Sequence, residues 1–214
     1  MNTPKLAVII PCFNEELCIK TTVNRLFEVF DDLISKNKIT PDSYLYLVDD
    51  GSSDSTWQII SELHAGDNRV KGMKFIRNYG NQKALIAGLE GVHRLGCDCV
   101  VSIDADLQQD ENSIEKFIDK YMEGYDIVSG IRNDRKTDTL FKKATAVMFY
   151  KTMNILGANI PMNHSDYRLV SRRALDVMDL YHEKALFLRG FFNEVGLKTA
   201  YVKFDVKPRM AGES

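Results

Sequence analysis

Short apolar runs rich in β-branched residues alternate along this chain with longer stretches whose apolar residues recur at helical spacing. The runs that indicate strands are 6–10, 44–48, 70–76, 99–103 and 125–129. The stretches that indicate helices are 15–36, one that begins near Ser55, 80–95 and 111–123. Strands that alternate with helices form a mainly parallel sheet covered on both faces. The sequence therefore predicts an α/β fold, and Ser55 with Gln58 predicts a capping box at the second helix.

The length of 214 residues predicts one domain, 1–214. No run approaches the roughly 18 apolar residues of a transmembrane helix, and the first residues do not resemble a secretory signal. The four cysteines lack the spacing of a zinc site, so we expect reduced thiols in a cytoplasmic protein.

Charge is distributed unevenly between the two parts of the chain. Residues 1–130 carry 13 basic and 21 acidic side chains, a net charge of −8, whereas residues 131–214 carry 15 and 9, a net charge of +6. Two interpretations stay open: solvated helix faces, or a second half that faces an anion such as a phosphate or an acidic lipid surface.

Polar clusters follow four of the expected strands, at the edge where parallel sheets bind ligands. They are Asn14-Glu15, Asp49-Asp50-Gly51-Ser52, Arg77-Asn78 and Asp104-Ala105-Asp106. Two carboxylates separated by one alanine, with amide oxygens nearby, suit Mg²⁺ or Mn²⁺ that also binds substrate phosphates. The alternative is a loop in which Asp106 or Asp110 caps the next helix.

The cluster after the second expected strand also has two interpretations. An acid at a strand end can accept hydrogen bonds from ribose hydroxyls or a base N–H, and Gly51 permits a turn with positive φ. Taken alone, the same residues would form a turn and a helix cap.

Together these motifs resemble glycosyltransferase family 2, and within it the polyprenyl-phosphate branch of dolichyl-phosphate mannose synthases and bactoprenol glucosyltransferases. The resemblance covers nearly all of the chain and implies a GT-A-type, Rossmann-like nucleotide-binding fold. The motifs that carry it are P-C-F-N-E (11–15), V-D-D-G-S-S-D-S-T (48–56), R-N-Y-G-N-Q-K-A (77–84), D-A-D-L-Q (104–108), F-K-K-A-T-A-V-M-F-Y (141–150), H-S-D-Y-R-L (164–169) and R-M-A-G-E-S (209–214).

The resemblance also implies roles for individual residues. The nucleotide site would comprise Pro11, Phe13, Glu15, Asp49 and Asp50, joined at the donor by Asp104, Ala105 and Asp106. The metal would be held by Asp104, Asp106 and Gln108. Phosphates would be met by Arg132, Lys142 or Lys143, and Arg209, with Asp166 and Arg168 near the reacting centre. Solvated helix positions for Lys142 and Lys143, and an exposed strand position for Arg168, are the alternatives.

Two departures from the family pattern concern the loops of this site. Gln109-Asp110-Glu111-Asn112 replaces the prolines that often follow D-x-D-L-Q, and Asn163 and Ser165 replace an aspartate and a glycine before the later motif. Both leave the local loop shape to be determined.

The resemblance implies a single displacement with inversion at the anomeric carbon. A phosphate monoester has a second pKa near 6 and is mostly a dianion at neutral pH, so we expect that no strong base is needed. Whether Asp166 acts as a base or only as a positioning group stays open.

Other classes of protein are the alternatives to a lipid-phosphate glycosyltransferase. A transferase to a soluble or lipopolysaccharide sugar hydroxyl would need Asp166 as a base, and a catalytically silent nucleotide-sugar-binding module would need no catalytic residue. A processive synthase would have Q-x-x-R-W downstream, but the only tryptophan is Trp57, far upstream. A dinucleotide oxidoreductase would have G-x-G-x-x-G after the first strand, where this chain has P-C-F-N-E-E.

The expected donor is UDP-glucose, with GDP-mannose next. Enzymes of this kind usually continue into hydrophobic C-terminal helices. We therefore expect a catalytic portion of a protein that lies at the cytoplasmic face of a membrane.

Overall fold

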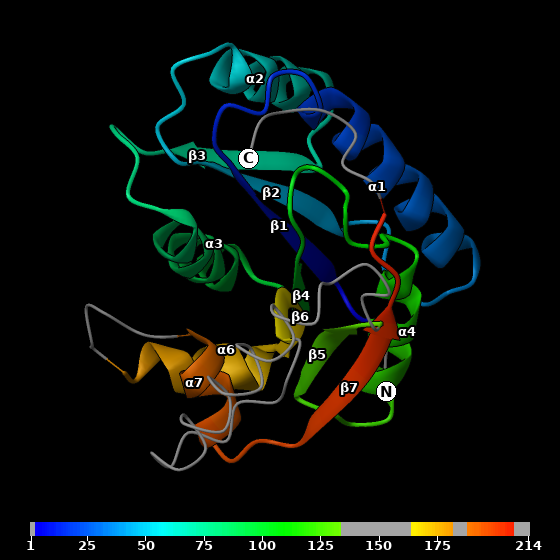
Figure 1. Ribbon diagram of the computed structural model, residues 1–214. Coiled ribbons are helices and arrows are strands. Elements are labelled where there is room, and N and C mark those ends of the chain that lie inside the picture. The colour runs from blue at the N-terminus through cyan, green and yellow to red at the C-terminus, as the bar shows by residue number, and fades with distance from the viewer. Residues whose placement is uncertain (1–2, 134–163, 182–187, 208–214) are drawn as a thin grey trace, which may run out of the picture.

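The computed structural model describes residues 3–133, 164–181 and 188–207, which form a sheet with helices on both faces (Figure 1). The strands are β1 (Leu6–Cys12), β2 (Tyr44–Asp49), β3 (Val70–Lys74), β4 (Cys99–Ser102), β5 (Ile127–Arg132), β6 (His164–Ser171) and β7 (Thr199–Phe204). The helices are α1 (Ile19–Ser35), α2 (Thr56–Gly66), α3 (Asn81–Leu95), α4 (Ser113–Met122), α6 (Arg172–Asp179) and α7 (Leu188–Glu194). The predicted α/β class is confirmed.

The described strands form one seven-stranded sheet in the order β3-β2-β1-β4-β6-β5-β7. The strands β3, β2, β1 and β4 run parallel to one another, and β7 is parallel to β5. Only β6 is antiparallel, to both β4 and β5. The mainly parallel sheet is therefore confirmed, although the sequence did not predict β6 and β7.

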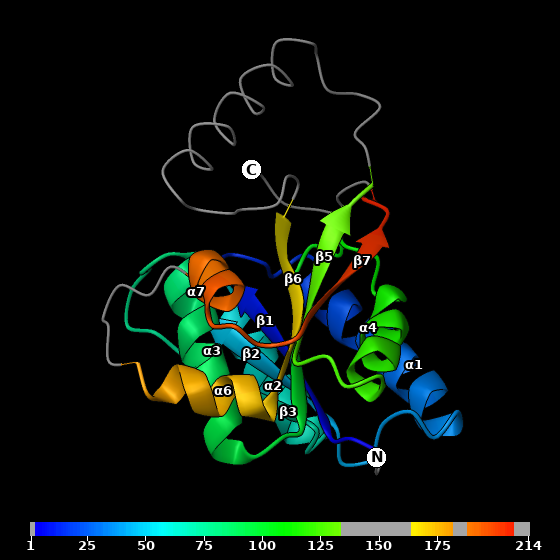
Figure 2. The ribbon, with the colours of Figure 1, turned by 90° about the horizontal axis from the view of Figure 1, so that it is seen from below.

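Side chains of β1 alternate between two apolar cores, one on each face of the sheet. Leu6, Val8 and Ile10 pack with residues of α1, α2 and α4, whereas Ala7 and Ile9 pack with residues of α3, α6 and α7. Figure 2 shows α1 and α4 on one side of the sheet and α3, α6 and α7 on the other. These five side chains are fully buried. Burial of each leucine, valine or isoleucine adds roughly 1.5–3 kcal/mol to the free energy of unfolding relative to an exposed side chain.

One expected helix start and one expected helix cap differ from the structure. The first helix begins at Ile19 rather than at residue 15, because Asn14 adopts a left-handed φ of 54° in the turn after β1. The predicted capping box is wrong: Ser55 occupies the N-cap of α2 without a side-chain bond. Asp54 Oδ1 accepts the Thr56 N–H instead, and Gln58 bonds to Glu62 on the helix surface.

None of the helices in the described part of the chain is both long and apolar enough to span a membrane.

Close contact between α3 and the sheet requires a glycine at residue 88. A Cβ at Gly88 would lie 2.6 Å from Ile9 Cγ2 and 3.2 Å from Val48 Cγ2. We expect Gly88→Ala to lower the free energy of unfolding by roughly 1–2 kcal/mol, because overpacking a filled core outweighs the gain in helix propensity. Urea unfolding measures this change.

The control is Gly66→Ala at the end of α2, where a Cβ would meet nothing within 4 Å. It should leave the unfolding midpoint unchanged or raise it. Equal midpoints for the two variants would contradict the close contact at Gly88.

Candidate functional site

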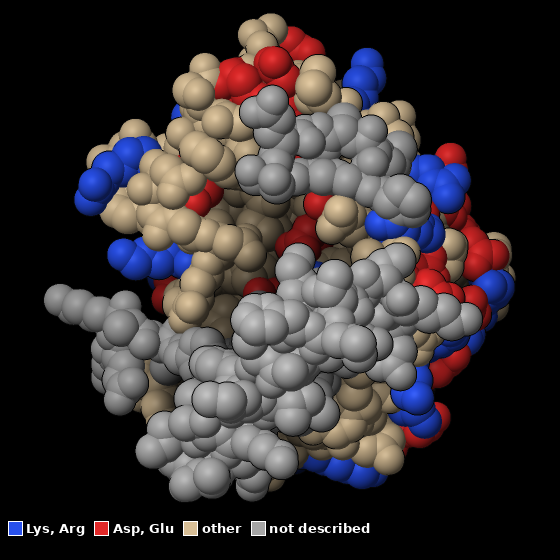
Figure 3. Space-filling view, in the orientation of Figure 1, with Lys and Arg blue, Asp and Glu red and all other residues tan. Residues whose placement is uncertain are grey.

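A hollow of about 410 Å³ lies at the carboxyl edge of the parallel strands. All four predicted clusters contribute a lining residue. The lining residues are Pro11, Cys12, Phe13, Glu15, Asp50, Asn78, Asn81, Ala84, Asp104, Ala105 and Asp106. Figure 3 shows this face hollowed near its centre, with acidic atoms inside. Residues far apart in the sequence are thus brought into one site, as the expected topology requires.

Asp50 shapes one wall of the hollow through its backbone partners. Its Oδ1 and Oδ2 accept the N–H groups of Tyr79 and Gly80 at 2.7 and 2.8 Å. The turn that begins at Gly51 passes so close to this loop that a Cβ there would lie 2.3 Å from the carbonyl carbon of Arg77. Gly51 also has a φ of 73°, as expected. Asp50 therefore fixes the loop between β3 and α3 while it lines the hollow.

Asp49 lies beneath the same turn and is fully buried. Its Oδ1 accepts the Ser52 N–H at 2.9 Å, and Lys74 Nζ lies 3.7 Å from Oδ2. Asp49 is not among the residues that line the hollow. Of the two neighbouring acids, only Asp50 reaches the site.

The carboxylate of Asp104 lies in an environment that disfavours its charge. Burial raises its pKa to about 6, and the nearby charges of Asp106 and Asp166 add to the rise. Glu15 raises the pKa slightly further, whereas the guanidinium of Arg132 opposes the rise. The structure therefore gathers acids from β1, β4 and β6 around one point and places one cation nearby.

The residues after Asp104 form a tight turn. Leu107 has a φ of 50°, and Asp106 Oδ1 accepts the Gln108 N–H at 3.1 Å. The helix α4 begins only at Ser113, beyond Asp110. Asp106 therefore caps no helix, and Asp110 is the acid that accepts the Asn112 N–H just before α4. A helix-capping role does not explain the pair Asp104 and Asp106.

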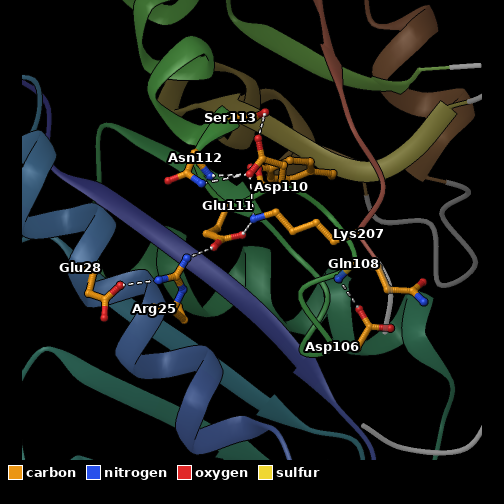
Figure 4. A network of polar contacts seen from close by, with 10 residues as sticks. Arg25, Glu28, Asp106, Gln108, Asp110, Glu111, Asn112, Ser113 and Lys207 are labelled. Carbon is orange, nitrogen blue, oxygen red and sulfur yellow. Dashed lines mark hydrogen bonds and ion pairs between the residues drawn. The ribbon is translucent and has the colours of Figure 1, made fainter. Parts of the chain in front are cut away.

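Residues that replace the expected prolines hold this loop in place (Figure 4). Glu111 is 2% exposed and accepts from Arg25 of α1 at 3.1 Å and from Lys207 at 2.5 Å. Lys207 also lies 2.9 Å from Asp110 Oδ1, and its N–H donates to Gln108 at 2.8 Å. The loop is thus anchored to α1 and to the segment after β7. Sequence reasoning missed these residues, although it singled out the departure from proline.

Asp166 and Arg168 lie on β6, beside the end of β4. Ser102 of β4 donates its hydroxyl to the Asp166 carbonyl oxygen. Arg168 is 4% exposed, donates to the Leu188 carbonyl at 3.4 Å and lies 5.1 Å from the Phe192 ring. Arg168 therefore lies in a strand, as the alternative had it, but its expected exposure is wrong, because its guanidinium packs against α7.

Of the four basic residues expected to meet phosphates, the structure describes Arg132. Arg132 ends β5, is half-buried, and its Nε has no hydrogen-bond partner among the described residues. Lys142, Lys143 and Arg209 lie outside the described residues.

The donor set fits a divalent cation that is shared with a ligand rather than enclosed by protein. Within the described residues, no group of three or more His, Cys, Asp or Glu side chains could hold a metal ion. Asp104 and Asp106 nevertheless line one hollow, with Gln108 two residues further on. Mg²⁺ is commonly bound by one or two carboxylates plus substrate phosphates, so these residues suit a cation bound together with a diphosphate.

The raised pKa of Asp104 makes its ionised form costly in the folded protein. Its folded pKa of about 6 exceeds the ordinary 3.8, so the folded protein binds this proton more tightly than the unfolded chain does. The stability that the protonated carboxyl contributes is present at low pH and is lost as the pH rises through 6. Asp104→Asn should therefore stabilise the chain in EDTA at pH 7.5 by roughly 1–3 kcal/mol. Thermal unfolding from pH 4 to 8 should show the gain vanish toward pH 4.

Asp179→Asn, at an exposed carboxylate at the end of α6, is the control and should show no such gain. An Asp104→Asn chain no more stable than wild type at pH 7.5 would contradict the electrostatic strain.

Two curated relatives and a family model match this chain. The model for glycosyl transferase family 2 matches residues 7–178. The chain is 47% identical over 211 residues to the glycosyltransferase YkoT of Bacillus subtilis, covering 99% of the chain and 62% of YkoT. It is 36% identical over 211 residues to a prophage bactoprenol glucosyl transferase homolog of Escherichia coli K12, covering 98% and 66%. The chain thus spans less than two thirds of the length of either relative.

A solved structure shares the fold. The glucosyl-3-phosphoglycerate synthase of Mycobacterium tuberculosis, in complex with Mn²⁺, UDP-glucose and phosphoglyceric acid, matches 98% of this chain with a TM-score of 0.61. The match covers 73% of that structure at 18% sequence identity, so it shows the GT-A type of fold alone. The family model and the two relatives show that the chain belongs to glycosyltransferase family 2.

Proposed function

We propose that this chain is the catalytic domain of an inverting, metal-dependent transferase that moves a hexose from a nucleotide sugar to a polyprenyl phosphate. The observation that carries the proposal is the pair Asp104 and Asp106 in a hollow built by four strand-end loops. UDP-glucose is the favoured donor, because a 36% identical relative is named as a bactoprenol glucosyl transferase homolog. GDP-mannose is the next donor to test.

The nucleotide would lie against Pro11, Phe13 and Glu15 at the end of β1. The Phe13 ring is 46% exposed and offers an apolar face for a base. Both carboxylate oxygens of Asp50 accept backbone N–H groups, so Asp50 would act by fixing the loop between β3 and α3, which forms the opposite wall of the hollow. That wall presents the amides of Asn78 and Asn81 to the hollow, and an amide can both donate to and accept from a nucleotide.

The donor diphosphate would meet the acid pair at the end of β4. Asp104 and Asp106, with Gln108, would hold Mg²⁺ or Mn²⁺ against it. When bound, the cation supplies positive charge to the leaving nucleotide as the sugar–phosphate bond breaks. The two carboxylates would orient the cation and the donor diphosphate so that the anomeric carbon of the sugar faces the acceptor.

The acceptor phosphate would approach from the basic second half of the chain. Arg132 lies near Asp104 and has a buried Nε without a hydrogen-bond partner among the described residues, and its guanidinium would pair with the acceptor phosphate. Lys142, Lys143 and Arg209 would add to this charge. The net charge of +6 over residues 131–214 also favours an anionic, cytoplasmic membrane surface.

Asp166 would orient a sugar hydroxyl or a neighbouring group rather than take a proton. A general base contributes typically about 10²–10⁴-fold to a rate, whereas a phosphate dianion needs no proton removed. Asp166→Asn should therefore reduce kcat with a polyprenyl-phosphate acceptor by less than about a hundredfold. A greater loss at unchanged donor affinity would favour a base, and with it a sugar-hydroxyl acceptor.

Calorimetric titration with UDP-glucose and GDP-mannose, each with and without Mn²⁺, tests the donor site. We expect Mn²⁺-dependent binding of UDP-glucose, and its loss in Asp106→Asn, because one of two carboxylate ligands is removed. Thermal unfolding of the variant controls for folding. Equal binding with and without Mn²⁺ would contradict the metal site, and no binding of either donor would contradict the donor assignment.

A further inference from the structure

Gln109 is a buried residue of the loop between β4 and α4 that the proposed chemistry does not yet use. It is 2% exposed, and both ends of its side-chain amide contact one residue. The Asp104 N–H donates to Gln109 Oε1 at 3.0 Å, and Gln109 Nε2 donates to Asp104 Oδ2 at 2.6 Å. One amide therefore holds both the backbone and the carboxylate of Asp104.

A third contact joins Gln109 to the strand that carries Asp166. Gln109 Nε2 lies 3.3 Å from the hydroxyl of Ser165, which is 2% exposed and also accepts the Tyr167 N–H at 3.2 Å. The backbone of Gln109 forms a bridge with Val206 after β7. Gln109 thus lies between β4, β6 and the segment after β7, and these contacts fix its position.

The consequence for Asp104 is a fixed carboxylate plane. A short hydrogen bond to an ionised oxygen is among the stronger ones in proteins, and it restrains rotation of the carboxylate. Because Oδ2 accepts the hydrogen bond from Gln109, Oδ1 is the oxygen that would bind a cation in the hollow. An amide also orients the carboxylate without neutralising it, whereas a lysine or arginine here would compete with the cation.

We propose that Gln109 is a positioning residue that orients Asp104 for the divalent cation and ties it to β6. This inference rests on the proposed function, because it assigns the cation to Asp104. Hydrogen-bonded partners of metal ligands typically contribute about 10–100-fold to metal affinity. The role requires an amide of this length, since one end must accept and the other must donate.

Two substitutions separate orientation from packing and charge. Gln109→Met keeps the length of the side chain and removes all of its hydrogen bonds. Gln109→Glu keeps the acceptor for the Asp104 N–H but sets a carboxylate oxygen against Asp104 Oδ2. The matched control is Gln58→Met, at an exposed amide on α2 that does not line the hollow.

The experiment measures Mn²⁺ binding to the chain with UDP present, from the electron paramagnetic resonance signal of free Mn²⁺. Calorimetry gives the UDP affinity without Mn²⁺, and thermal unfolding checks the fold. We expect Gln109→Met to weaken Mn²⁺ binding by about 10–100-fold at unchanged metal-free UDP affinity. Gln109→Glu should also bind Mn²⁺ more weakly than wild type despite its added negative charge, and Gln58→Met should match wild type.

The outcomes distinguish this inference from the proposed function beneath it. If wild type binds Mn²⁺ with UDP and either folded Gln109 variant binds it as tightly, the positioning role is wrong. Equal weakening of Mn²⁺ binding and of metal-free UDP binding would also overturn it, because that result indicates general damage to the site. If wild type binds no Mn²⁺ with UDP, the proposed metal-dependent function itself fails, and the role of Gln109 fails with it.

Discussion

The Asp104 carboxylate, just after β4, lies near the charges of Asp106 and Asp166, and hydrogen bonds with Gln109 hold it in position. Burial and these neighbours raise its pKa to about 6. Such a concentration of negative charge is unfavourable in the empty protein and becomes favourable when a divalent cation joins it. Among the described residues, Arg132 opposes this rise in pKa, and the proposed divalent cation would offset more of the negative charge.

The topology explains how the parts of this site come together. Parallel strands β1, β2, β3 and β4 bring four loops to one edge, and the antiparallel β6 then enters directly beside β4. Contacts from Ser102 to the Asp166 carbonyl, and from Gln109 to Ser165, join the two halves of the site. The loop itself is anchored by the ion pairs of Glu111 with Arg25 and Lys207.

Much of the fold could be predicted because the burial pattern of β1 to β5 and of α1 to α4 is local in the sequence. Most of these strands are apolar runs, β3 with two lysines being the exception, and each helix has one apolar face. The strand β6 entered only as an exposed alternative at Arg168, because Ser165 and Arg168 are polar and their burial depends on neighbours distant in the chain. The predicted capping box does not form: Ser55 is the N-cap of α2 without a side-chain bond, and Asp54 accepts the Thr56 N–H.

The site could be predicted at the level of loops but not of contacts. Strand ends indicated that Asp50 and Asp104 would meet, yet no local pattern shows that Asp49 turns inward while Asp50 holds the loop of Tyr79 and Gly80. The partners of Glu111 are likewise 86 and 96 residues away in sequence. Ion pairs at such separations depend on the finished topology and on no short motif.

Transfer of radiolabelled glucose from UDP-glucose to undecaprenyl phosphate in detergent micelles tests the central claim most directly. The account predicts that label moves into the organic phase as a lipid-linked, acid-labile product, and that EDTA abolishes the transfer. Label that passes to a sugar hydroxyl, with none reaching the lipid phosphate, would contradict it.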